Sequence, residues 1–277
     1  MSQNGTYFVF SGHSVGLAAH FHKLDDVQNL NHMVPAQAPS VLPATGGLSE
    51  GKVSNYRYAV DVPRKRTLVA LRHAETRVEG RTLPDRWETE VHADIQGVEI
   101  LEKLEVGRVK VHMLSSRATS ADAETKISTK GSSIEGLQLG GVSVKVVLDD
   151  DVIEFCASKD KLADYYRKQA PAWRGANARR FTTDPDSPEI HEVNGRVRFS
   201  LAREIHLSGT QDPNHLVRVE EDGYTIKWDG FGRIIIGEVF VKGNDRRVTM
   251  LRLHMGSDGG GSGSVGDTSS NGQTSGS

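Results

Sequence analysis

The two-residue alternation of apolar and polar side chains is the feature that most constrains how this chain folds. Along residues 87–95 the odd positions are mainly apolar and the even positions are charged or polar, and residues 197–207 follow the same pattern over most of their length. Successive side chains of a β-strand point to opposite faces of its sheet, so this period buries one face and exposes the other. The pattern predicts half-buried strands and a mainly β fold.

Further strand candidates run through most of the chain and are separated by turns rich in Gly, Asn and Asp. They are residues 7–10, 16–22, 56–62, 67–73, 106–114, 143–148, 225–228, 234–241 and 248–255. Such turns favour antiparallel hairpins. We therefore expect a β-sandwich or an elongated antiparallel or mixed sheet. A parallel β-helix is the alternative, because residues 98–111 and 134–148 hold short strands at close spacing, although the hairpin turns weigh against it.

One segment departs from this pattern. Ser158 is placed to cap a helix in which Leu162 and Tyr166 recur at helical spacing, and Pro171 ends that helix. We expect this helix, at about residues 158–170, as an insertion between two blocks of strands. The proline-containing stretch 29–51 is expected to be an extended connection or an edge segment, because proline disfavours both helices and central strands.

The expected β-rich domain covers residues 6–255, and residues 1–5 form an N-terminal extension. From Gly256 onward, eight Gly and seven Ser occur among the last 22 residues, and Val265 is the only large apolar side chain. Such a segment buries too little surface to offset the entropy lost when its backbone is ordered. We expect residues 256–277 to be a flexible tail, the alternative being a tail that is ordered only against neighbouring subunits.

Composition argues against several classes of protein. The 277 residues carry a formal net charge of -2, which gives no global attraction for nucleic acid or anionic lipid. No apolar stretch approaches the ~18 residues of a membrane-spanning helix, and the single cysteine, Cys156, excludes an intrachain disulfide. The first residues lack the basic and apolar regions of a signal peptide. The compartment therefore stays unknown, with a cytoplasmic location or export by a non-classical route as the expectations.

The best candidate for a metal site is a pair of histidines near the N-terminus. His20 and His22 would point to one face of a strand, and Asp25 follows them closely. Imidazole and carboxylate groups at such spacing are ligands for zinc and similar metals. The alternative is that the two histidines are ordinary surface residues on the solvent-exposed face of a strand. A metal-assisted hydrolase that uses these three residues is one functional hypothesis.

Two further groups of residues are candidates for binding. Trp228, with Asp229 and Phe231, lies at a predicted strand end and could stack on a sugar ring. The second group is a basic stretch interleaved with aromatic residues, which could hold an acidic protein surface and, less favourably, a phosphate backbone. A solvated helix face, followed by a basic stretch that nearby acidic residues balance, is the favoured interpretation. The cationic residues of this second group are Arg167, Lys168, Arg174, Arg179 and Arg180.

Several short motifs resemble those of the bacterial surface proteins called choice-of-anchor proteins. The motifs are Val98-Glu99-Ile100-Leu101, Leu104-Glu105-Val106-Gly107-Arg108-Val109, Ser132-Ser133-Ile134-Glu135-Gly136-Leu137-Gln138-Leu139-Gly140-Gly141, and Gly237-Glu238-Val239 with the Gly/Ser-rich tail that follows. The resemblance covers about half of the chain, which departs from the pattern in showing no secretion signal and no recognisable anchor. It implies a non-enzymatic, β-built surface protein and carries over no functional residue.

The sequence contains no coherent catalytic set. The Gly-x-Ser-x-Gly elbow, the His-Glu-x-x-His zinc motif and the phosphate-binding Gly-x-x-x-x-Gly-Lys-[Ser/Thr] loop are all absent. We therefore expect a non-catalytic structural or adhesive protein, without a cofactor, that forms homo-oligomers or binds a protein partner, because sheet edges are templates for strand addition. A nucleic-acid partner is not favoured. Glycan binding and metal-assisted hydrolysis are the alternatives.

Overall fold

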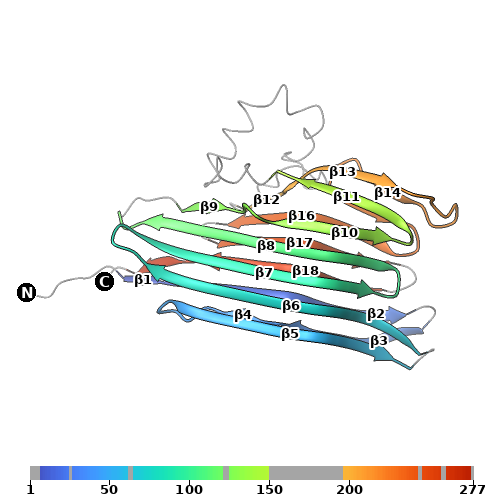
Figure 1. Ribbon diagram of the computed structural model, residues 1–277, viewed down its shortest axis with the longest axis horizontal. Coiled ribbons are helices and arrows are strands. Elements are labelled where there is room, and N and C mark those ends of the chain that lie inside the picture. Colours follow the sequence, from blue (N-terminus) through green and yellow to red (C-terminus); the bar gives the residue numbers. More distant parts are fainter. Residues whose placement is uncertain are drawn as a thin grey trace, which may run out of the picture.

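The computed structural model describes residues 7–24, 27–61, 65–120, 125–149, 196–242, 245–256 and 260–275. These residues form two large antiparallel sheets that lie face to face, with the long strands of both sheets running along the longest axis of the molecule (Figure 1). A separate short pair joins β1 (Tyr7–Val9) to β19 (Gln273–Ser275), so that the two ends of the chain lie side by side. The prediction of a β-rich, antiparallel fold is confirmed.

The first sheet, called sheet I here, has eight strands. Its strand order is β13-β11-β10-β8-β7-β6-β5, and β9 pairs with β8 beside this path. In chain order the strands are β5 (Gly47–Val60), β6 (Arg66–Thr82), β7 (Arg86–Ile100), β8 (Leu104–Ala118), β9 (Lys126–Ser128), β10 (Ser133–Leu139), β11 (Val142–Leu148) and β13 (Ala202–Ser208).

The second sheet, called sheet II, has nine strands in the order β14-β15-β16-β17-β18-β2-β3, with β12 paired to β16 and β4 paired to β2. In chain order the strands are β2 (Gly12–Leu24), β3 (Val27–Gln37), β4 (Ser40–Val41), β12 (Arg196–Ser200), β14 (Val217–Val219), β15 (Thr225–Trp228), β16 (Gly232–Lys242), β17 (Asp245–Met255) and β18 (Gly261–Asn271). Residues from both ends of the chain therefore build the middle of this sheet.

The alternating pattern places one face of each sheet in a shared core. On β7, Trp87, Val91 and Ile95 are buried, while the even-numbered residues between them are only half-buried on the outer face. The Trp87 ring stacks on Phe8 with centroids 4.9 Å apart, which joins the β1 segment to the core. The hydrophobic effect that stabilises the fold is therefore concentrated between the sheets.

The alternation reverses along a line that crosses sheet I. The register places Asn55, Arg72, Gly97, Gly107 and Gly136 opposite one another on five neighbouring strands. Residues on both sides of this line, such as Ile95 and Val98 on β7, are buried although three positions separate them, and the strands keep their register through the line. Positive φ angles at Asn55, Gly97 and Gly136 permit this reversal, since glycine reaches that region at little cost.

Sheet II carries an equivalent line. Gly16, Gly266, Met250 and Gly237 lie opposite one another on β2, β18, β17 and β16, and φ is positive at Gly266 and Gly237. We call these two lines the reversal rows. The sheet II row lies close to the facing sheet, because a Cβ atom on Gly16 would be 2.9 Å from the Cβ of Ala74 on β6. The small residues thus let the two sheets approach each other closely.

The expectation of a flexible Gly/Ser-rich tail is wrong for β18. This strand lies between β17 and β2, and Val265 at its centre is fully buried. Its hydroxyl groups have partners: Thr268 Oγ1 donates to the Val248 carbonyl at 3.3 Å, and Ser269 Oγ lies 2.7 Å from His13 Nδ1. Backbone pairing on both sides and satisfied hydroxyls order a segment whose own composition favours disorder.

The other expectations about architecture have mixed outcomes. The parallel β-helix alternative is wrong, because every large-sheet pairing in the described residues is antiparallel. The helix expected at 158–170 and the extension at 1–5 lie outside the described residues. Within those residues there is no helix that could cross a membrane. The stretch 29–51 does contain an edge strand, β3, with Pro35 in it.

Candidate functional site

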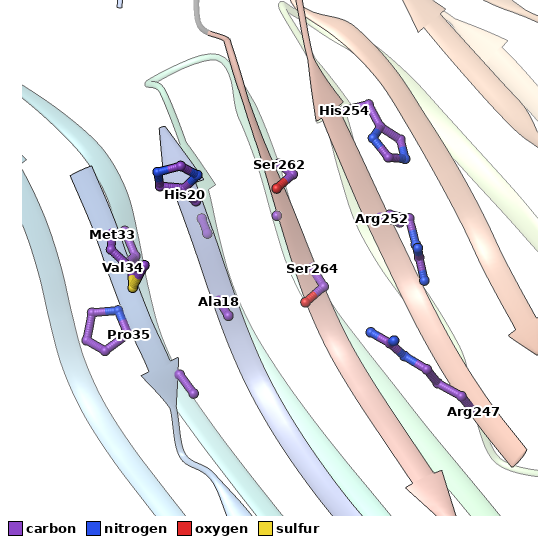
Figure 2. A pocket seen from close by; sticks show the side chains of 13 residues that line it. Ala18, His20, Met33, Val34, Pro35, Arg247, Arg252, His254, Ser262 and Ser264 are labelled. Atoms are coloured by element: carbon purple, nitrogen blue, oxygen red, sulfur yellow. The ribbon is translucent and has the colours of Figure 1, made fainter. Parts of the chain in front are cut away.

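A groove runs along the outer face of sheet II over β18 (Figure 2). Its volume is about 510 Å³. The floor is low because Ala18, Ser262 and Ser264 are small, and longer side chains from β2, β3 and β17 stand on its two sides. Those longer side chains are His20 beside Met33 and Pro35 on one side, and Arg247, Arg252 and His254 on the other. We call this feature the β18 groove.

Two ion pairs fix the arginines of the β18 groove. Arg247 donates through Nε to Asp267 Oδ1 at 2.7 Å and through a second nitrogen to Oδ2 at 2.5 Å, and this pairing raises the pKa of Arg247. Arg252 lies 2.5 Å from Glu238, whose side chain is only 3% exposed. The arginine wall is therefore a rigid, largely neutralised surface rather than a set of free cations.

The predicted glycan-stacking site is not available for stacking. Trp228 is 5% exposed and Phe231 is 2% exposed, and their rings stack on each other with centroids 4.8 Å apart. The indole also covers Gly140, where an added Cβ atom would come within 2.7 Å of the ring. Only Asp229 keeps substantial exposure, and it lies 4.0 Å from Arg218. These rings serve as core packing, so the prediction of a sugar-stacking platform is wrong.

The predicted metal ligands are brought together only in part. His20 and His22 do share one face of β2, with ring centroids 6.1 Å apart, and His20 Nε2 lies 2.9 Å from Asn31 Oδ1. Asp25 lies outside the described residues, as does the whole basic stretch that contains Arg167, Lys168, Arg174, Arg179 and Arg180.

A different cluster of metal-ligating side chains lies on the outer face of sheet I. Glu90 and His92 lie on β7 and His112 lies opposite His92 on β8; their ligand atoms all fall within 4.8 Å of one another. Burial would raise the pKa of Glu90, but hydrogen bonds from His92 and His112 outweigh burial and lower it. Beside this cluster, the guanidinium of Arg108 holds the pKa of Asp94 below its ordinary value.

This cluster was not among the sites predicted from the sequence. The alternation along residues 87–95 correctly places Glu90 and His92 on the polar face of a strand, but it does not reveal that His112 lies beside them. The signal that could have found the cluster is the Glu-x-His spacing, which places two ligands on one strand face, combined with the register of the hairpin that follows.

The sheets also leave long edges unpaired. β5 pairs with β6 on one side only, and in the described part of the chain no strand pairs with its other side. β5 and β3, an edge of sheet II, lie along the same border of the molecule, the lower one in Figure 1. The hydroxyl of Tyr58 on β5 lies 3.4 Å from His32 Nδ1 on β3. Within the described residues, this border therefore presents one unpaired side of a 14-residue strand.

These features define the protein as an open, two-sheet antiparallel β protein with a surface groove and free strand edges. Residues 8–242 match the family described as Domain of unknown function (DUF8256), so the chain belongs to that family. No curated protein and no solved structure matches the chain.

Proposed function

We propose that this protein is a non-catalytic structural or adhesive β protein that assembles with copies of itself through the free edge of β5. The observation that carries the proposal is the 14-residue length of this strand, one side of which has no partner among the residues that the structure describes. An unpaired edge presents a row of backbone donors and acceptors, and a second strand can satisfy them all at once. Resemblance to choice-of-anchor surface proteins supports the same proposal.

The side chains of β5 fit pairing between two identical strands. A twofold axis at Gly51 would place Glu50 of one copy opposite Lys52 of the other, and the same pair would form again by symmetry. Both side chains are exposed, at 56% and 64%. Opposite charges across neighbouring strands contribute roughly 0.2–1 kcal/mol per pair, and like charges are unfavourable. The charges of β5 therefore favour an antiparallel self-pair.

The proposal predicts an oligomer whose stability depends on these charges. In size-exclusion chromatography with light scattering, the wild-type protein should reach at least twice the 30.3 kDa of one chain within the micromolar range. Glu50→Lys should weaken assembly, because it sets like charges opposite each other, and the double variant Glu50→Lys with Lys52→Glu should restore it.

The controls separate assembly from folding. Both residues are exposed and their contacts within the chain are loose, with Arg77 3.9 Å from Glu50 and Glu75 3.5 Å from Lys52. The substitutions set like charges opposite these two partners on β6, which for exposed side chains should cost less than about 1 kcal/mol each and lower the melting temperature only slightly. A wild-type chain that stays monomeric across the micromolar range and captures no partner would rule the proposal out. If both variants form the same oligomer as the wild type, the contact between subunits lies away from β5.

Glycan binding is a second candidate function, and the β18 groove is the surface that favours it. The groove offers serine hydroxyls on its floor and histidine and arginine side chains along its walls, and such polar groups can fix the orientation of a ligand. We expect the Ser264→Trp substitution, which fills the groove, to reduce any binding signal on a glycan array. The Trp228→Phe substitution should leave that signal unchanged. An array without signal would remove this candidate.

A further inference from the structure

Three ligand atoms converge on the outer face of sheet I. His92 Nε2 lies 3.0 Å and His112 Nε2 lies 3.1 Å from the same oxygen, Oε1 of Glu90. The two imidazole rings are stacked nearly parallel, with centroids 4.4 Å apart and an angle of 18° between their planes. Both nitrogen atoms therefore point at one small volume next to a carboxylate oxygen.

The surroundings hold two of these ligands in a metal-binding orientation. His112 Nδ1 lies 2.5 Å from the carbonyl oxygen of Lys130, and because a carbonyl only accepts hydrogen bonds, Nδ1 carries the proton. The second oxygen of Glu90 accepts a hydrogen bond of 2.9 Å from Arg81. Such hydrogen bonds, donated by a ligating histidine to a carbonyl and accepted by a ligating carboxylate, are the usual outer shell of a metal site.

This orientation defines the position that a bound cation would take. With the proton on Nδ1, the lone pair of His112 Nε2 faces Glu90 Oε1, and the two repel unless a proton or a cation lies between them. One divalent cation would serve both nitrogens and the oxygen together.

We propose that Glu90, His92 and His112 bind one divalent transition-metal ion, with zinc the best fit. Two imidazoles and one carboxylate form a common three-ligand set for zinc, whereas calcium and magnesium prefer oxygen ligands alone. Three protein ligands leave a coordination position open. A hollow of about 430 Å³ lies beside the two histidines, lined also by Arg77, Arg108 and Lys110, so water or a small anion can reach that position.

The test measures binding of zinc alone to untagged, full-length protein that has been stripped with a chelator and dialysed. Titration calorimetry should give one site per chain. His92→Ala and Glu90→Gln should each weaken binding by at least about tenfold, since even the loss of an outer-shell partner has effects of that size. His112→Asn, whose amide can still donate to the Lys130 carbonyl, should weaken binding to the same extent without loss of fold.

The other histidine pair of the chain is the matched control. His20→Ala with His22→Ala removes two histidines from a single strand of sheet II and should leave zinc affinity unchanged. Electron paramagnetic resonance of the Cu²⁺-loaded wild type should show coupling to two nitrogens, and this readout needs no variant. The proposal is overturned if zinc does not bind, if the sheet I variants bind as tightly as wild type, or if only the His20/His22 variant loses the metal.

Discussion

A chain that ends at Gly256 is expected to be unfolded. Deleting residues 257–277 removes β18, which pairs along its length with β17 on one side and β2 on the other. Sheet II would be cut into two parts, each with a new unpaired edge facing the gap. Ten residues of β18 are paired with β17 and nine with β2, and each such pair corresponds on average to about one backbone hydrogen bond. At about 0.5–1.5 kcal/mol net per hydrogen bond, their loss is comparable to the whole stability of a typical domain, about 5–15 kcal/mol.

Circular dichroism and urea denaturation test this expectation. The shortened chain should lack the β-sheet spectrum and a cooperative unfolding transition. The control is a chain that ends at Gly272, which keeps β18 and loses only the short β19, and it should unfold cooperatively. A chain ending at Gly256 that unfolds like the wild type would show that β18 is not part of the folded core.

The position of β18 also bears on where the folded unit ends. The family match stops at residue 242, before β17 and β18 begin. In this chain, however, those two strands lie between β16 and β2. The strands β2, β3 and β4 are therefore joined to the rest of sheet II only through β17 and β18 in the described residues. We infer that a fragment bounded by the family match lacks the strands that join its own N-terminal and later parts.

Prediction from sequence succeeded where strands alternate regularly and failed where they do not. β7 and β8 follow the alternation over most of their length and were expected. β18 was missed because glycine and serine carry little strand propensity, and because the strands on its two sides come from distant parts of the sequence. The burial of β18 is provided by the strands on its two sides, and it therefore cannot be predicted from the composition of the segment itself.

The site was harder to predict than the fold, for a physical reason. The pairing of His92 with His112 depends on the hairpin between β7 and β8, whose turn contains Leu101 and Glu102. Both residues have φ near +56°, a conformation that usually calls for Gly, Asn or Asp. The turn therefore carried no sequence signal, and the register could not be read. The sugar-stacking prediction at Trp228 was wrong for a different reason: the sequence did carry a signal, but an aromatic residue beside a glycine-rich turn is as compatible with core packing as with binding.

Gly266→Val is expected to destabilise the protein by about 4 kcal/mol, because two penalties add at this position of the sheet II reversal row. The φ angle is +62°, a region that a β-branched residue adopts with strain. The new Cβ would lie 2.7 Å from Cγ2 of Val111 and 3.2 Å from Cγ1 of Val109, on the facing sheet. Both neighbours are fully packed in the core, so neither has room to move away.

A second glycine separates the two penalties. Gly141 also has a positive φ, +87°, but a Cβ atom there would meet nothing within 4 Å. Gly141→Val should therefore cost only the backbone strain, about 1–2 kcal/mol in urea denaturation. If the remaining loss at Gly266 comes from the close approach of the sheets, Val111→Ala should recover part of it in the double variant, since the clashing methyl group is gone. Equal losses at both glycines, or no recovery with Val111→Ala, would mean that the sheet II reversal row does not set the distance between the sheets.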